Sequence, residues 1–177
     1  MIRRFTADDE DNLVSLNSDP EVMRYISGGL PTSREEVRDR IIPFHLEAYE
    51  RHPGFGTWAA DDAGTGEFLG WFHLRPRQAD GAIDIGYRLR RAVWGRGLAT
   101  EGSVALIDKA FAEHDLDRVV SETMTLNSAS RRVLEKCGLS LIRTYFDNDI
   151  HTVEGVDQEC VEYELTRAQW QAARPAG

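Results

Sequence analysis

The segment WGRGLATEG, Trp94 to Gly102, places two glycines two residues apart directly before residues that favour a helix. The first amides of a helix have no acceptor within it, and the aligned peptide dipoles add about half a positive elementary charge at that end. Glycine lets an anion approach these amides closely, because it has no side chain and adopts a positive φ without strain. We interpret the segment as an anion-binding loop in which a ligand replaces the helix cap, with a simple glycine turn as the alternative.

Other nucleotide and metal motifs are missing from the sequence. The segment lacks the third glycine of GxGxxG, no acidic residue ends a following strand about 20 residues later, and no GxxxxGK[ST] occurs. Cys137 and Cys160 form no CxxC pair, and the five histidines form no HExxH or paired cluster. We therefore expect two buried or half-buried thiols, no disulfide framework and no metal site.

The surrounding residues predict the elements that position this loop. The expected strands cover about 2–5, 55–61, 67–75, 82–90, 117–126, 139–147 and 157–165. The expected helices follow Thr6, Asp19-Pro20 and Ser33, run from Leu98 to Glu113 with Ala99, Val104, Ala105, Leu106 and Phe111 towards the core, and occupy NSASRRVLEKCG. Pro43 should kink or split the third helix, and Gly138 should end the last.

This order of elements predicts a mixed α+β fold, with antiparallel strands first and a βαβα unit later. A length of 177 residues with 41% apolar side chains suits one domain over 1–177, without repeats or linkers. The net charge of −9 disfavours nucleic acid and slightly favours a cationic partner or substrate. Apolar runs are short, so we expect a soluble cytoplasmic protein without a membrane segment.

Two separated motifs resemble the GNAT superfamily of acyl-CoA-dependent N-acyltransferases. They are IDIGYRLRRAVWGRGLATEG, at 83–102, and ETMTLNSASRRVLEKCGLSLIRTY, at 122–145. Within the superfamily the chain is most similar to the ribosomal-protein N-terminal (RimJ/RimL-like) acetyltransferase branch and its small-molecule relatives. NSDPEVMRYI and VEYELTRAQW extend this similarity over nearly the full chain. The resemblance implies a GNAT fold, a mostly antiparallel twisted sheet of about seven strands with splayed middle strands and flanking helices.

The resemblance also implies how acetyl-CoA is bound. The family's pyrophosphate loop falls on Trp94 to Ala99, although Trp94 stands where Gln or Arg is usual. The preceding strand end matches the segment that pairs with the pantetheine arm and offers an amide to the thioester oxygen, which would stabilise the developing oxyanion. The cofactor-binding residues implied are Tyr87, Arg88, Leu89, Trp94, Gly95, Arg96, Gly97, Leu98, Ala99, Thr100, Asn127 and Ser130.

A second implied CoA contact is the helix that begins with the NxxS motif at Asn127 and Ser130. The Asn127 amide suits pantetheine, and capping of this helix is its alternative role. Many members have a tyrosine four residues after the serine that protonates the departing thiolate, but this chain has Leu134. The resemblance therefore gives that proton to Ser130 or to water. The basic residues Arg131, Arg132 and Lys136 suit either the 3′-phosphate of CoA or a solvated helix face.

Amine acetylation also needs a group that removes a proton from the acceptor. An α-amino group titrates near 8 and a lysine-like amine near 10.4, so the help required depends on the substrate. Asp84 is the catalytic candidate, because the superfamily often has a carboxylate at this place on the strand. Alternation predicts Asp84 and Gly86 on one face and Tyr87 on the other. Weaker candidates are Glu122, Asp149 and His73, while Glu101 fits a helix-dipole role.

The predicted function is transfer of an acetyl group from acetyl-CoA to a primary amine by direct attack in a ternary complex. The acceptor would be a small molecule or a protein N-terminus. The sequence does not determine whether the protein forms a homodimer. Alternatives are a bulkier acyl group such as succinyl and a CoA-binding sensor or scaffold without turnover. Glu35, Glu36, Asp147 and Asp149 suit a basic acceptor or serve solubility.

Overall fold

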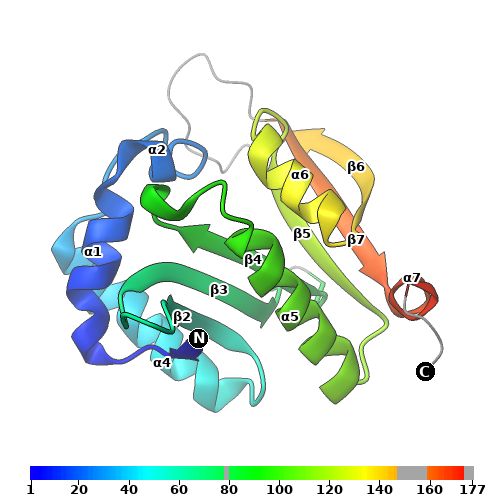
Figure 1. Ribbon diagram of the computed structural model, residues 1–177, viewed down its shortest axis with the longest axis horizontal. Helices are drawn as coiled ribbons and strands as arrows, with labels where there is room; N and C mark the ends of the chain where they lie inside the picture. Colours follow the sequence, from blue (N-terminus) through cyan, green and yellow to red (C-terminus); the bar gives the residue numbers. More distant parts are fainter. Residues whose placement is uncertain (78–79, 147–158, 174–177) are drawn as a thin grey trace.

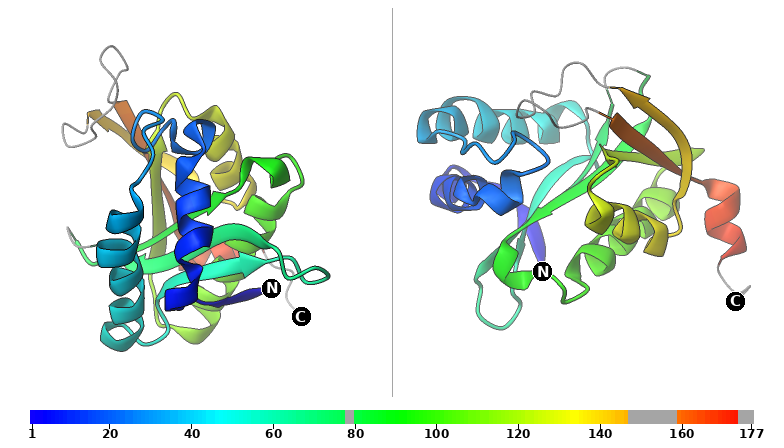
Figure 2. Two further views of the ribbon diagram at one scale, coloured as in Figure 1. Left: turned by 90° about the vertical axis from the view of Figure 1, so that its left-hand side faces the viewer. Right: turned by 90° about the horizontal axis from the view of Figure 1, so that it is seen from above.

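The computed structural model describes residues 1–77, 80–146 and 159–173, which form one twisted sheet flanked by helices (Figure 1). The strands are β1 (Ile2–Arg4), β2 (Gly56–Asp61), β3 (Phe68–Pro76), β4 (Ile83–Leu89), β5 (Arg118–Met124), β6 (Ser140–Phe146) and β7 (Glu159–Thr166). The helical segments are η1 (Ala7–Asp9), α1 (Glu10–Ser18), α2 (Pro20–Met23), α3 (Arg34–Glu36), η2 (Val37–Ile41), α4 (Ile42–Arg51), η3 (Arg91–Val93), α5 (Leu98–Glu113), α6 (Ser128–Lys136) and α7 (Arg167–Ala172). Helices α1 and α4 cover one face of the sheet, and α5 and α6 cover the other (Figure 2).

The sheet opens between its two central strands. The seven strands lie in the order β1-β2-β3-β4-β5-β7-β6, and every described pairing is antiparallel except that of β4 with β5. The parallel β4–β5 register pairs only Ile83 with Val119 and Asp84 with Val120. Beyond Asp84 the two strands diverge, so the later half of β4 has β3 as its one strand partner within the described residues. This confirms the expected α+β class, the mostly antiparallel sheet and the splayed middle strands.

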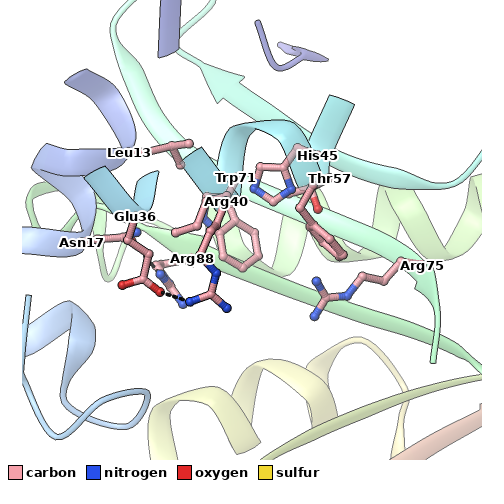
Figure 3. A pocket seen from close by; sticks show the side chains of 11 residues that line it. Leu13, Asn17, Glu36, Arg40, His45, Thr57, Trp71, Arg75 and Arg88 are labelled. Carbon is pink, nitrogen blue, oxygen red and sulfur yellow. Dashed lines mark hydrogen bonds and ion pairs between the residues drawn. The ribbon is translucent and has the colours of Figure 1, made fainter. Parts of the chain in front are cut away.

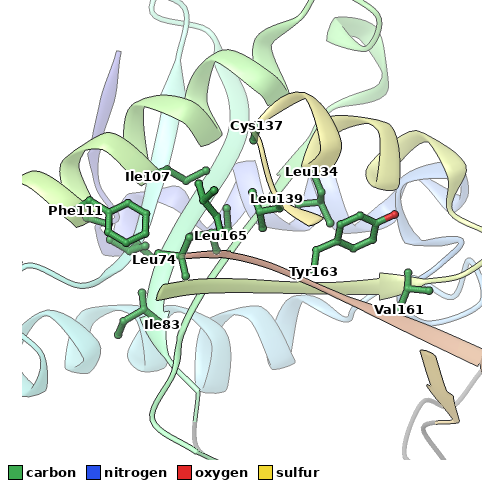
Figure 4. Close-up of a cluster of buried hydrophobic side chains, with 13 residues drawn as sticks. Leu74, Ile83, Ile107, Phe111, Leu134, Cys137, Leu139, Val161, Tyr163 and Leu165 are labelled. Atoms are coloured by element: carbon green, nitrogen blue, oxygen red, sulfur yellow. The ribbon is translucent and has the colours of Figure 1, made fainter. Parts of the chain in front are cut away.

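The two faces of β4 look into different parts of the molecule. Ile83 and Ile85 belong to the buried cluster between the sheet and helices α5 and α6, which also contains Ile107, Phe111 and Leu134 (Figure 4). Each large apolar side chain buried there stabilises the fold by about 1.5–3 kcal/mol. The alternate positions of β4 face α1 and α4, as the alternation of strand side chains predicts. One strand therefore borders both the α5–α6 side and the α1–α4 side.

Local sequence signals place most helix ends correctly. Thr6 accepts the Asp8 amide at 3.3 Å and forms a capping box with Asp9 before α1. Pro43 lies in the first turn of α4, directly after the π-helical turn η2, so the helix is split there as expected. Gly138 has φ +89° and ends α6.

One expectation about the helices was wrong, and one helix was missed. Val104 and Ala105 are exposed, because the buried face of α5 follows the spacing of Ser103, Leu106, Ile107, Ala110 and Phe111. The short helix α7 was not predicted. It packs on the end of α5, where Trp170 Nε1 donates to Asp108 Oδ1 at 2.9 Å and Arg167 donates to the Phe111 carbonyl at 3.0 Å.

Asp9 joins the start of α1 to the sheet. It is 2% exposed and accepts two hydrogen bonds from the Arg3 guanidinium, both at 2.8 Å, one from the Thr6 amide at 2.9 Å and one from Asn12 at 2.9 Å. Burial opposes ionisation of this carboxyl, but the hydrogen bonds from Arg3, Thr6 and Asn12 outweigh it and hold the pKa of Asp9 at about 2.

Asp9→Asn is expected to lower the free energy of unfolding at pH 7 by about 2 kcal/mol, because Arg3 loses a charged partner in a buried site. Since the folded pKa lies below the unfolded value of 3.8, this stabilisation is present above pH 4 and is lost as pH falls through about 2. Urea unfolding of both proteins should therefore converge between pH 5 and pH 2. Asp39→Asn, at an exposed pair with Arg38, is the control and should leave stability unchanged. A deficit that is independent of pH would contradict this account.

Candidate active site

The loop between β4 and α5 exposes a row of backbone amides. Gly95 and Gly97 have φ values of +75° and +82°, and a Cβ added at either would meet no atom within 4 Å. No side chain caps α5, which begins directly after Gly97. Within the part of the chain that the structure describes, the amides of 95–100 have no acceptor, and the first bonded one, Glu101, donates to the Gly97 carbonyl at 3.0 Å. The loop therefore has the open, glycine-lined form that an anion requires.

Trp94, which departs from the usual residue of this loop, has a structural contact. Its Nε1 donates to the Leu89 carbonyl at 2.8 Å, so the indole links the last residue of β4 to the start of the loop. The side chain is 48% exposed, which leaves one side of the ring open. Hydrogen bonding to the strand end thus accounts for a tryptophan where Gln or Arg is usual.

The end of β4 sends neighbouring side chains to opposite faces. Tyr87 packs with Leu89, Leu98 and Ala99 on the α5 side. Burial raises the pKa of Tyr87, and a hydrogen bond with the Ser130 side chain opposes that rise. Arg88 points the other way, because its Nη1 donates to Asn17 Oδ1 of α1 at 2.6 Å. Its side chain therefore lies on the α1–α4 side and away from the loop.

Helix α6 brings Asn127 and Ser130 to the α5 side. Asn127 Oδ1 accepts the Ser130 amide at 3.1 Å, so Asn127 does cap the helix, and its Nδ2 donors point to no described acceptor. Leu134 is 2% exposed within the main core, which leaves no hydroxyl at the position of the usual tyrosine. Arg131 is occupied by the Tyr163 hydroxyl at 3.1 Å and the Thr125 carbonyl at 3.2 Å, whereas Arg132 and Lys136 are exposed.

On the opposite face of β4, Asp84 is paired with His73. His73 Nε2 lies 2.8 Å from Asp84 Oδ2, and the ring stacks on Trp71 at 5.6 Å. Burial lowers the pKa of His73 and the Asp84 carboxylate only partly offsets this, so the ring is neutral at pH 7. A carboxylate only accepts, so the neutral ring carries its proton on Nε2. Its Nδ1 is buried without a hydrogen-bond partner among the described residues.

Two adjoining cavities lie on this face, with volumes of about 400 and 350 Å³. They share Phe44, Thr57 and Arg75. Asp84 and Glu122 both line the second cavity, which places the two candidate bases in one space. Figure 3 shows side chains from α1, α4 and the sheet around the first cavity.

The other acidic groups near the cavities are engaged. Glu122 accepts from the Tyr145 hydroxyl and lies 3.7 Å from Arg77. Glu162, which the sequence did not single out, is 3% exposed and binds Arg77 at 2.6 Å and Arg143. Burial alone would raise the pKa of Glu162, but these guanidiniums lower it. Glu162 is thus an ionised structural residue that joins the end of β3 to β6 and β7.

The remaining candidates divide between described and undescribed residues. Glu101 is exposed in the first turn of α5, as a helix-dipole role requires. Cys137 and Cys160 are buried, and burial raises the pKa of Cys137 to about 11. Asp147 and Asp149 lie outside the described residues. No group of three or more metal-ligating side chains forms in the described chain, and no described helix has the length and apolar character to cross a membrane.

The sequence of the chain matches a known family over most of its length. The model of the acetyltransferase (GNAT) domain matches residues 1–140. The chain belongs to the GNAT acetyltransferase family. It is also 33% identical over 165 residues to the FsC-acetyl coenzyme A-N(2)-transacetylase of Aspergillus fumigatus, covering 89% of this chain and 69% of the relative.

Solved structures show the same fold. A GNAT acetyltransferase from Bacillus anthracis has a TM-score of 0.75 at 21% identity, over 93% of each chain. RimL, the ribosomal L7/L12 α-N-protein acetyltransferase solved with coenzyme A, has a TM-score of 0.76 at 19% identity over 93% of this chain and 92% of its own. The family match and the relative from Aspergillus fumigatus identify this GNAT protein as an acyl-CoA-dependent N-acyltransferase.

Proposed function

We propose that this GNAT protein transfers an acetyl group from acetyl-CoA to a primary amine on a small molecule or a protein N-terminus. The observation that carries the proposal is the arrangement around β4. The residues that follow the amide-lined loop pack with Tyr87 and Leu89 on one face of this strand, and Asp84 and its cavity lie on the other. Glu122 of β5, beyond the point where β4 and β5 diverge, lines the same cavity. The name of the relative from Aspergillus fumigatus, with acetyl coenzyme A as donor and a nitrogen as acceptor, is consistent with this chemistry.

The chain offers a fitting site for CoA. The amides from Gly95 to Thr100 would bind its pyrophosphate, since the space beside Gly95 and Gly97 is open and leaves these amides accessible to a phosphate. The backbone of 87–89, which lacks a strand partner on the β5 side in the described chain, would pair with the pantetheine arm. Asn127 Nδ2 would bind a pantetheine carbonyl while Oδ1 caps α6.

The proton transfers fall to two residues on opposite faces. Acetyl-CoA supplies the activated thioester, and no covalent enzyme intermediate is required. Asp84 would accept the proton of the acceptor amine, directly or through one water, while neutral His73 orients the carboxylate through Oδ2. Ser130, next to the Tyr87 hydroxyl, would pass a proton to the leaving thiolate.

A second candidate function is CoA binding without turnover. The buried Leu134 favours it, because the tyrosine that serves as acid in many members is replaced by a core side chain. A bulkier acyl donor such as succinyl-CoA is a third candidate that uses the same loop.

A thiol-release assay with acetyl-CoA tests the proposal across α-amino acids, alkylamines, polyamines, aminoglycosides and peptides. We expect thiol release that depends on an amine and forms an acetylated amine of matching mass. The same assay with succinyl-CoA separates the donors, since an acetyltransferase should prefer acetyl-CoA. Stoichiometric CoA binding by isothermal titration with no thiol release from any amine would favour the sensor.

A further inference from the structure

Arg88 lines the first cavity, and its guanidinium has no carboxylate partner among the described residues. Nη1 bonds the Asn17 amide oxygen at 2.6 Å, and the guanidinium lies 5.1 Å from the centre of the Trp71 ring. Nε is buried without a hydrogen-bond partner. Of the carboxylates that line the described cavities, Glu36 pairs with Arg40, Asp84 with His73 and Arg75, and Glu122 with Arg77, and none pairs with Arg88. A half-buried guanidinium with a buried, unpartnered Nε and no counter-ion is costly, so a ligand of negative charge would stabilise this site.

The charged groups around Arg88 do not neutralise it. Arg75 from β3 lines the same cavity, and its Nε is 3.9 Å from Asp84, at the limit of an ion pair. Arg40 from η2 is paired with Glu36 at 3.3 Å, so this pair adds no net charge. Figure 3 shows these three arginines around the cavity, each from a different element.

The titratable ring in this cavity is also neutral. Burial, followed by repulsion from Arg75, lowers the pKa of His45 to about 4. For Arg88 itself, burial and then Arg75 lower the pKa to about 10, so the guanidinium is still charged at pH 7. The cavity therefore carries net positive charge, although the whole chain has a net charge of −9.

From this geometry we infer that the acceptor is an amine that also carries a carboxylate, with the carboxylate bound by Arg88 and Arg75 and the amine directed to Asp84. The inference rests on the proposed acetyl transfer. Arg75 is opposite Asp84 in the β3–β4 register, and Trp71 is opposite Arg88. Asp84 and Arg88 are four residues apart on one face of β4, which spans about 13 Å between Cα atoms before the long arginine side chain is considered. A polyamine, which the acidic composition would favour, would meet like charge here.

Paired acceptors in the acetyl-CoA thiol-release assay test the inference. The pairs are 4-aminobutanoate with 4-aminobutanamide, leucine with leucinamide, and the amidated peptides Ala-Glu-Gly with Ala-Gln-Gly, with spermidine added. We expect kcat/KM to be about 10 to 100 times higher for the carboxylate member, which is the range that charge-assisted hydrogen bonds give. The amino-acid pairs and the peptide pair separate a small-molecule carboxylate from an acidic side chain near a protein N-terminus.

Variants of Arg88 identify the group responsible. Arg88→Met should raise KM at least about tenfold more for the carboxylate member than for the uncharged member, so that the preference within each pair is lost. Arg88→Lys should retain part of the preference for the carboxylate, since lysine keeps the positive charge but cannot form the two parallel hydrogen bonds that a guanidinium gives a carboxylate. Arg38→Met, at an exposed pair with Asp39, is the matched control and should behave as the unaltered protein. Circular dichroism checks that each variant folds.

A binding measurement that needs no turnover separates this inference from the proposed function. The CoA-saturated protein is titrated with glutarate by NMR, and we expect saturable binding that Arg88→Met abolishes. Glutarate binding without thiol release from any amine would leave the anion site intact and contradict the acetyl transfer. Equal or higher kcat/KM for the amides or for spermidine, or an equal effect of Arg88→Met on both members of a pair, would overturn the inference while turnover itself stands.

Discussion

Replacing Gly97 by tryptophan is expected to weaken CoA binding by at least about a hundredfold, because the indole would occupy the space through which a phosphate reaches the amides of the loop. Several charge-assisted hydrogen bonds depend on that approach, and each contributes about 1.5–3 kcal/mol. The φ of +82° adds backbone strain of about 1–2 kcal/mol in any residue with a side chain. Isothermal titration with CoA measures the effect directly.

Gly81→Trp controls for that strain. Gly81 has φ +71° and equally open space around it, but it lies before β4, at the opposite end of this strand from the loop. The control should lose comparable stability and keep its CoA affinity. If a folded Gly97→Trp protein binds CoA as tightly as the unaltered protein, the loop is not the pyrophosphate site.

Asp84→Asn should lower kcat by about 10²- to 10⁴-fold, the contribution of a positioned general base, while CoA affinity stays the same. The asparagine keeps the shape of the side chain and can still accept a hydrogen bond from His73 Nε2, but it takes up no proton. The loss should be larger for an acceptor of high pKa than for an α-amine, since the former holds its proton more strongly at pH 7.

Asp115→Asn is the matched control, because this carboxylate is fully exposed and lies far along the chain, beyond α5. It should retain full activity. If Asp84→Asn keeps kcat within about threefold for all amines, water alone removes the proton and the residue is structural.

The conformation of the loop between β4 and α5 was the feature that sequence reasoning described best. Its conformation depends on neighbouring residues, namely two glycines before a helix with no capping side chain. Such local determinants can be identified from a single sequence. The helix start at Thr6 and the helix end at Gly138 were predicted correctly for the same reason, and Asn127 caps its helix as the alternative interpretation held. The assignment of Asp84 and Tyr87 to opposite faces of β4 followed from the alternation of side chains along a strand, which does not depend on how the strand pairs with its neighbours.

The face of β4 that carries Asp84 and Arg88, the proposed acceptor side, depends on contacts that a single sequence does not contain. Asp84 and His73 meet because β3 and β4 pair in a particular register, which places Gly86 opposite His73 and leaves room for the ring over it. The side chain of Arg88 was expected on a segment assigned to CoA, whereas packing against Asn17 of α1 directs it to the cavity. Trp94 likewise depends on a contact made in the folded chain, the hydrogen bond from its indole to the Leu89 carbonyl.

The divergence of β4 from β5 also affects how such a protein can change over time. In the proposed arrangement acetyl-CoA contacts one face of β4 and the acceptor contacts the other, so whether a position is even or odd determines which reactant a mutation there affects. Asp84 and Arg88 border the cavities, and odd positions from 85 to 89 pack towards α5. Acceptor preference can therefore drift among descendants of one ancestor while handling of the common donor is inherited unchanged.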